Sequence, residues 1–324
     1  MLKYRCMTSI LILPLSLSPL ACAATSGHAE APDETTAQPM AASAEDGAEQ
    51  GEQTRASLVN ESGLPSSVER TEHFDRPGFF TALHGGRLWV LREGSEALEA
   101  FLADGPPPHN VIRVGAGPQA LSIRAVDKET IIEYLATKRG FHVELIDGRL
   151  WVLEKDTEEY EAFKADGPGP HSVTQVGAGP QNVSVRSIDR ETLLRYLGSK
   201  PGFHVEVIDD RLWVLEEGTE AHEKFFDDGP PPHSVTQIGA GPLGTSLRAV
   251  DRETIIAYLA VKPGFHTKLM DGRIWVLRQA SKAYEAFKEG GPPAHSVTRI
   301  GAGPLQTSLR AADAETIDDY LRTQ

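Results

Sequence analysis

Cysteines, long apolar runs and basic residues are all scarce in this chain. Only Cys6 and Cys22 occur among its 324 residues, so no disulfide framework is available beyond the N-terminal segment. No run of about 20 apolar residues occurs, so no membrane-spanning helix is predicted. The 32 basic residues are outnumbered by 46 acids, for a net charge of -14. This argues against a nucleic-acid partner, because phosphate backbones are bound by clustered Lys and Arg.

The remaining composition is typical of a folded protein. Hydrophobic residues make up 40% of the chain and charged residues 24%, so most of it can bury a core. The length is sufficient for two domains of ordinary size or for several small ones.

Residues 1–22 have the composition of an export signal. Lys3 and Arg5 give a positive start, and the segment from Ser9 to Leu20 is apolar but too short to span a membrane. Small residues follow around Cys22. The segment resembles a bacterial lipoprotein signal, in which a lipid is attached to the first cysteine after the cleavage site. The resemblance implies acylation of Cys22 and an anchor in the cell envelope, at the outer membrane or in the periplasm.

The leader departs from the lipoprotein pattern at one position. The family prefers Leu three residues before the cysteine, and Pro19 stands there instead. Plain secretion, with cleavage after Ala23 or Ala24, is therefore the alternative to lipid attachment.

Residues 23–75 differ in composition from the rest of the chain. They carry eleven acids against two bases, Arg55 and Arg70, and few bulky apolar residues. Such a segment buries too little surface to offset its chain entropy, so a disordered acidic linker is predicted. A helix over about residues 41–56 is the alternative.

An internal repeat dominates the remainder of the chain. All four tryptophans are spaced by 62 residues, namely Trp89, Trp151, Trp213 and Trp275. The same spacing relates four histidines and four Gly-Ala-Gly-Pro loops. This periodicity predicts four tandem units, repeat 1 (76–137), repeat 2 (138–199), repeat 3 (200–261) and repeat 4 (262–324).

Repeat 3 shows the local pattern most clearly. Alternating apolar residues predict two strands joined by a tight turn at Asp209 and Asp210. A helix capped by Thr219 and stopped at Gly229 follows, and then two more strands and a second helix capped by Asp251. The predicted fold class is α+β, with a ββαββα order in each repeat. We expect the helices to pack on one face of an antiparallel sheet.

The turn also predicts the pairing of the first hairpin. Val205 should pair with Val214 on one face, and Glu206 with Trp213 on the other. The Trp-bearing face then contacts a neighbouring repeat or a ligand such as a sugar, unless tryptophan is plain core. Repeat 1 differs from the other copies on this face, which is expected of the end unit of a stacked array.

Two arginines recur in each repeat and form a candidate anion site. If a repeat brings them together, they offer a site for a carboxylate or sulfate. The alternative is that they pair with acids of the second helix, such as Asp189 and Glu191. The pairs are Arg149 with Arg186 and Arg211 with Arg248, with counterparts Arg87 with Arg124 and Arg273 with Arg310.

Other motifs favour structural roles. His204 and Glu206 point the same way on a strand, but two ligands are too few for a metal. The loop from Gly177 to Pro180 is typical of a turn that needs positive φ rather than of a phosphate cradle. The recurring histidine, such as His171, is expected to donate to helix carbonyls. No metal, cofactor or catalytic residue is predicted.

The sequence therefore predicts an exported, lipid-anchored cell-envelope protein with four modules that act in binding or structural interaction, without catalysis. A cell-wall glycan or another envelope protein is the expected partner, beside the membrane that holds the lipid. The alternatives are an enzyme or enzyme subunit with a site between repeats, and a passive surface spacer.

Overall fold

The computed structural model describes residues 68–323, which fall within one compact unit. The leader, Cys22 and the acidic linker up to residue 67 lie outside the described residues. Every repeat has the same order of elements, with a short 3-10 turn (η) between its third and fourth strands. Repeat 1 contains β2 (Phe79–His84), β3 (Arg87–Arg92), α1 (Glu96–Asp104), β4 (Val111–Arg113), η2 (Pro118–Ala120), β5 (Ile123–Ala125) and α2 (Lys128–Ala136). Repeat 2 contains β6 (Phe141–Ile146), β7 (Arg149–Glu154), α3 (Glu158–Asp166), β8 (Val173–Gln175), η3 (Pro180–Asn182), β9 (Val185–Ser187) and α4 (Arg190–Gly198).

Repeats 3 and 4 follow the same plan. Repeat 3 contains β10 (Phe203–Ile208), β11 (Arg211–Glu216), α5 (Glu220–Asp228), β12 (Val235–Gln237), η4 (Pro242–Gly244), β13 (Ser246–Ala249) and α6 (Arg252–Ala260). Repeat 4 contains β14 (Phe265–Met270), β15 (Arg273–Arg278), α7 (Lys282–Gly290), β16 (Val297–Arg299), η5 (Pro304–Gln306), β17 (Ser308–Ala311) and α8 (Ala314–Arg322). The predicted α+β class and ββαββα order are confirmed.

The hairpin register is also as predicted. Val205 pairs with Val214 and Glu206 with Trp213, around a turn in which Asp209 and Asp210 have φ of 51° and 57°. Two successive positive φ values are those of a type I′ turn, whose twist matches that of the flanking strands.

The sheets are mixed, and the expectation of an antiparallel sheet is wrong. In repeat 3 the strand order is β10-β11-β13-β12, and β11 runs parallel to β13. The chain crosses over through α5, runs out along the edge strand β12 and returns through η4 as β13. Because β13 enters between β12 and β11, it lies antiparallel to the one and parallel to the other.

Helices cover both faces of each sheet, so the expectation of helices on one face is also wrong. On the Trp-bearing face of repeat 3, Trp213 and Leu215 pack with Phe225 of α5. On the opposite face, Leu212 and Val214 pack with Ile255 and Tyr258 of α6. The hairpin is apolar on both faces because each face has a helix of its own to bury.

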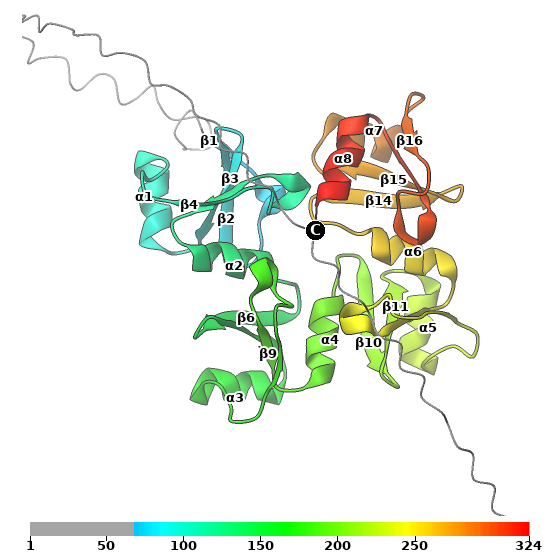
Figure 1. Cartoon of the computed structure of the whole chain (residues 1–324), viewed down its shortest axis with the longest axis horizontal. Coiled ribbons are helices and arrows are strands. Elements are labelled where there is room, and N and C mark those ends of the chain that lie inside the picture. Colours follow the sequence, from blue (N-terminus) through cyan, green and yellow to red (C-terminus); the bar gives the residue numbers. More distant parts are fainter. Residues whose placement is uncertain (1–67, 324) are drawn as a thin grey trace, which may run out of the picture. The chain divides into compact units, whose positions relative to one another are not determined.

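The second helix of a repeat packs on two sheets. Ile255 of α6 lies in the core of repeat 3, whereas the next residue, Ile256, lies in the core of repeat 4. Ile131 and Ile132 of α2 divide in the same way between repeats 1 and 2. Figure 1 shows α2 between the strands of repeat 1 and β6. Successive repeats are thus joined through the face opposite the tryptophan.

Ordered structure begins before repeat 1, and this corrects the predicted end of the linker at residue 75. β1 (Val68–Arg70) pairs with β2, and a 3-10 turn, η1 (Glu72–Phe74), follows. Phe74 is buried in the core of repeat 1, at the position that Ala136 occupies ahead of repeat 2. No second helix of another repeat precedes repeat 1, and the Phe74 ring takes the position that such a helix fills in the core of the later repeats.

Repeat 1 also touches repeat 4. The backbone N–H of Gln119 in η2 donates to the Pro263 carbonyl at 3.2 Å. Its side-chain amide donates to the carbonyls of Gly264 and Gln279 at 3.0 and 3.1 Å, and α8 contacts η2. The contacts between repeats therefore run in a cycle, and the expectation that repeat 1 is an end unit with no neighbour on one side is wrong.

Candidate functional site

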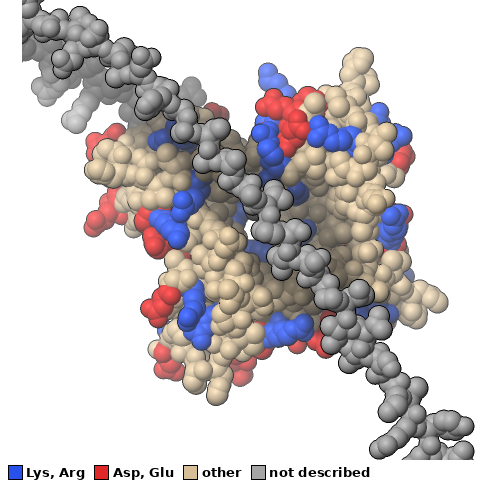
Figure 2. Space-filling view, viewed as in Figure 1, with Lys and Arg blue, Asp and Glu red and all other residues tan. Residues whose placement is uncertain are grey.

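A central cavity lies between the repeats. It has a volume of about 2200 Å³ and is lined by residues of all four repeats. Figure 2 shows the surface hollowed at this place, with Lys and Arg side chains along its walls. Since the cycle of contacts encloses this space, no single repeat contains the site.

Four equivalent basic residues line the cavity, one from the start of each repeat. We call them the inner cations: Arg76, Lys138, Lys200 and Lys262. Each follows a second helix or, in repeat 1, η1, and each precedes the first strand of a hairpin. The sequence repeat and the closure of the cycle together bring all four to one cavity.

Each inner cation donates to carbonyls at or beyond the end of the second helix in its own repeat. The Lys138 Nζ atom lies 2.7 Å from the Tyr196 carbonyl and 3.1 Å from that of Ser199. The Lys200 Nζ atom donates to the Tyr258 carbonyl at 2.9 Å. Helix C-termini carry unpaired carbonyls and partial negative charge, so a cation is favoured there.

The other two inner cations, Arg76 and Lys262, make the same kind of hydrogen bond. Arg76 donates through Nη1 to the Tyr134 and Leu135 carbonyls at 2.7 and 2.8 Å, and Lys262 to that of Thr323 at 2.5 Å. All four cations also lie over a tyrosine ring of that helix, 4.5–4.9 Å from its centre.

The inner cations influence one another's charge. Burial lowers the pKa of the Lys138 ammonium to about 7, with further lowering from the charges of Lys200 and Arg76. Burial, and then the charge of Lys262, lowers the pKa of Lys200 to about 8. A lowered lysine pKa means that the charged form is under-stabilised. The fold therefore holds these two lysines where their charged forms are disfavoured, and Lys138 is only partly charged at neutral pH.

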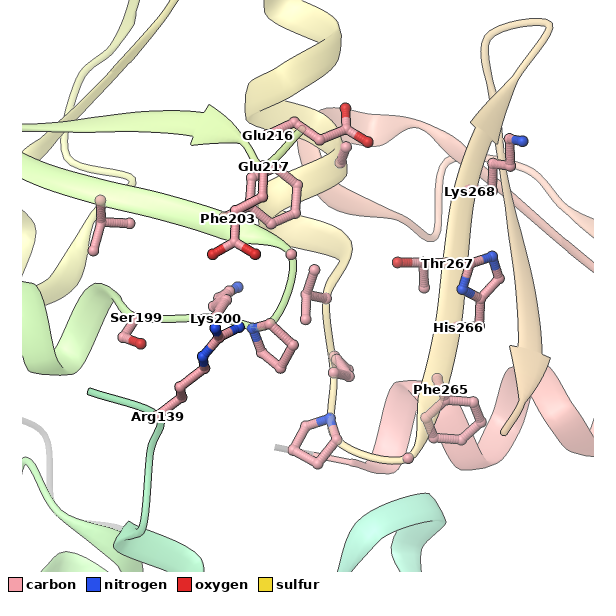
Figure 3. Close-up of a pocket in the computed structure, with 18 of the residues that line it drawn as sticks. Arg139, Ser199, Lys200, Phe203, Glu216, Glu217, Phe265, His266, Thr267 and Lys268 are labelled. Atoms are coloured by element: carbon pink, nitrogen blue, oxygen red, sulfur yellow. The ribbon is translucent and has the colours of Figure 1, made fainter. Parts of the chain in front are cut away.

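A fifth cation, Arg139, extends this cluster. Its side chain is exposed on the cavity wall, and Figure 3 shows it reaching from repeat 2 toward Lys200 of repeat 3. Glu217 points to the same region in Figure 3. Across residues 68–323, no carboxylate lies within 4.0 Å of a side-chain nitrogen of Arg139 or the inner cations.

Three acids on the wall have ion-pair partners, whereas Glu216, Glu217, Asp251, Glu253 and Asp271 also line the cavity and pair with no described cation. Arg195 lies 3.0 Å from a Glu154 carboxylate oxygen and 3.2 Å from one of Glu206. Asp75 pairs with Arg70. The wall therefore carries unpaired acids as well as the five cations, and none of the described acids comes within 4.0 Å of one of these cations.

The tryptophans lie away from this cavity. Trp89, Trp151, Trp213 and Trp275 are only 0–3% exposed and pack on a phenylalanine of the first helix of their own repeat. The expectation that the Trp-bearing face meets a neighbour or a ligand is therefore corrected, because α1, α3, α5 and α7 cover it.

The recurring arginine pairs are not assembled either. The Arg186 guanidinium lies 4.7 Å from the centre of the Trp151 ring and donates to the Ser172 hydroxyl at 2.8 Å. Arg248 repeats this with Trp213 and Ser234. Arg149 and Arg211 are exposed, with no ion pair to any described residue.

Among the other motifs, the glycine-rich loop has the predicted role, whereas the recurring histidine does not. Gly177 begins its loop with φ of 70°, which confirms the predicted positive-φ turn. His171 is exposed and bonds to no helix carbonyl among the described residues. His204 Nε2 and Glu206 Oε2 are 3.8 Å apart, and residues 68–323 contain no group of three metal-ligating side chains.

Sequence analysis missed the inner cations, although one signal was available. A basic residue recurs every 62 residues at the start of each repeat. A basic residue between a helix and a strand is unremarkable by itself, and its meaning depends on the closure of the cycle.

No family model, curated protein or solved structure matches this chain. Within the described part of the chain, no helix is long and apolar enough to cross a membrane. The leader sequence and the geometry of the cavity are therefore the features of this chain that bear on its function.

Proposed function

We propose that this chain is an exported, lipid-anchored protein of the cell envelope whose four repeats form a non-catalytic binding scaffold. The leader supports export and the location in the cell envelope, because it has Lys3 and Arg5 at its start and small residues around Cys22. The cavity lined by all four repeats is the observation that carries the binding role.

The size of the cavity indicates the kind of partner. Sites for single small molecules usually enclose about 300–1,000 Å³. A volume of about 2200 Å³ suits an extended ligand, such as a segment of cell-wall glycan or of another envelope protein. The walls also repeat, and repeated walls fit a partner that is itself built from repeating units.

The lipid anchor in the cell envelope is tested by fractionating cells that express the full chain. Wild-type protein should partition into detergent, and Cys22→Ser should remain unprocessed or become soluble. A soluble wild type whose N-terminus is Ala24 or Thr25 would instead establish plain secretion.

Binding is tested by co-sedimentation of the detergent-solubilised full chain with purified cell-wall glycan. Arg139→Glu reverses a charge on the cavity wall and should change the bound fraction. Arg149→Glu is the matched control, because Arg149 is also exposed but lies outside the cavity lining. Equal binding by both variants would argue against the cavity as the site.

The two alternatives have their own outcomes. Turnover of generic glycosidase, esterase or peptidase substrates, abolished by variants in the cavity, would replace the binding role with an enzyme. A chain that binds neither glycan nor any envelope protein would be a passive spacer.

A further inference from the structure

We infer that the inner cations and Arg139 form a binding site for a multiply charged oxyanion, phosphorylated or polycarboxylated, at the centre of the four-repeat cycle. The inference rests on the proposed binding function and names the chemistry of its ligand. Its basis is five cations that converge on one cavity without a carboxylate partner in residues 68–323.

The cations retain donors for such a ligand. An ammonium has three N–H donors, and Lys200 and Lys262 each use one on a helix carbonyl. The Arg76 guanidinium bonds through Nη1 alone, and Arg139 makes no hydrogen bond to any described residue. Lys138 uses all three donors on carbonyls and, with a pKa of about 7, contributes only part of a charge at neutral pH.

Helix capping explains only part of this arrangement. One cation at each helix end would satisfy the local carbonyls, and helices elsewhere in these repeats are capped without one. Capping does not require four such cations to face one cavity, where their like charges oppose one another. It also gives no reason for Arg139, which caps no helix. An oxyanion at the centre would offset the repulsion and use the free donors together.

The ligand must carry more than one negative charge. The donors come from different repeats, so a ligand that contacts several of them has to bridge the cavity. A chain of phosphates, or a molecule with two or three carboxylates, meets that requirement, and a single chloride ion does not. The net charge of -14 on the whole chain makes non-specific attraction of anions weak, so saturable binding would point to this cavity.

The test is isothermal titration calorimetry of the detergent-solubilised full chain with tripolyphosphate and, separately, with citrate. We expect saturable binding of at least one of them, with one site per chain. The stronger of the two identifies the natural ligand as phosphorylated or carboxylated. Arg139→Gln should weaken binding about tenfold, because charge-assisted hydrogen bonds are among the strong ones.

Two variants keep the inference open to refutation. Arg149→Gln removes another exposed arginine, which lies outside the cavity lining, and should leave the affinity unchanged. Lys200→Met removes an inner cation, and its circular dichroism reports whether the fold survives. Absence of saturable binding by wild type at millimolar anion, or equal losses in Arg139→Gln and Arg149→Gln, would overturn the inference.

The result separates this inference from the proposed function. Binding of cell-wall glycan without binding of either anion leaves the scaffold role intact and refutes the oxyanion site. Binding of an anion without any glycan supports the oxyanion site and turns the search toward a charged soluble partner.

Discussion

The three joints between successive repeats differ in kind from the contact that closes the cycle. In α6, Ile256 and Ala260 enter the core of the next repeat. The equivalent positions of α8 carry Asp318 and Arg322, and Asp318 pairs with Arg299 at 2.6 Å instead. The joints bury apolar side chains, whereas the closing contact uses hydrogen bonds.

The 3-10 turns show the same difference. Leu305 of repeat 4 packs against the cores of repeats 3 and 4. Its counterpart in repeat 1 is Gln119, which bonds to carbonyls of repeat 4. End repeats of stacked arrays usually have polar outer faces, and here two such faces meet. A hydrogen bond within the protein replaces bonds to water and therefore adds little net stability. The closing contact should consequently open before the apolar joints do.

The largest expected effect is that the joints between successive repeats lose stability at alkaline pH. The hydroxyls of Tyr196, Tyr258 and Tyr320 each donate to a carbonyl in the last residues of the preceding repeat's second helix, at 2.6–2.8 Å, and Tyr134 donates to the Phe74 carbonyl. Burial raises the pKa of Tyr134 to about 12 and raises the pKa values of the other three.

Unfolded tyrosines release their protons near pH 10, before the folded ones do. The stabilisation is therefore fully present below pH 10 and is lost as the pH rises through the folded pKa values. With four protons involved, the free energy of unfolding should fall by up to about 5 kcal/mol per pH unit. The lowered pKa values of Lys138 and Lys200 act in the opposite sense only up to about pH 10.5, where unfolded lysine also loses its proton. Urea titrations at about pH 10.5, 11 and 11.5 therefore measure the tyrosine slope. Tyr134→Phe should reduce it by about a quarter, and an unchanged stability at pH 11 would show that these hydroxyls are not buried.

The second effect is local to one repeat. Phe225→Ala removes the ring that α5 places on Trp213 and should cost about 3–5 kcal/mol. Because this face makes no joint, repeat 3 should unfold in a separate step. Phe226→Ala is the control, since that ring is 62% exposed and its loss should cost far less. A single unchanged transition for Phe225→Ala would contradict the packing.

Adjacent isoleucines in α6 distinguish a repeat core from a joint. Ile255→Ala and Ile256→Ala should each cost about 2–5 kcal/mol, since both side chains are buried. Ile255→Ala should destabilise repeat 3, whereas Ile256→Ala should uncouple repeats 3 and 4. Hydrogen exchange resolved by segment measures which repeat loses protection. Loss confined to repeat 3 in both variants would show that α6 does not form the joint.

The smallest effect concerns the closing contact. Gln119→Ala removes two hydrogen bonds and should cost about 1–3 kcal/mol. Faster exchange of amides in η2 and β14, without loss of the repeat cores, is the expected result. Gln181→Ala is the matched control from repeat 2, where the residue accepts a hydrogen bond from Arg113 instead. Faster exchange in every repeat after Gln119→Ala would mean that closure supports the whole fold.

Much of each repeat could be predicted because its signals are local. The turn at Asp209 and Asp210 determines the hairpin register, and the cap at Asp251 begins the second helix, where it accepts a bond from Thr254. The failed expectations concern longer-range packing. Apolar residues on both faces of a hairpin predict that both faces are buried, but they do not indicate which helix covers each face.

The candidate site lay beyond prediction for the same reason. Lys138 and Lys200 are 62 positions apart in the chain, and only the folded joints bring them to one cavity. The arginine pairs were candidates because both arginines recur in every repeat, but Arg186 lies opposite Trp151 in the sheet and packs its guanidinium on that ring.

By itself, the sequence determined the number of repeats, the order of their elements and the pairing of each hairpin, because caps, turns and alternation act over a few residues. Only the tertiary structure decided that the second helices lie between repeats, that the cycle closes at Gln119 and that the inner cations meet. These features depend on the orientation of neighbouring repeats at each joint, summed over four copies. Side-chain packing at each joint sets this orientation, and no local pattern encodes the sum.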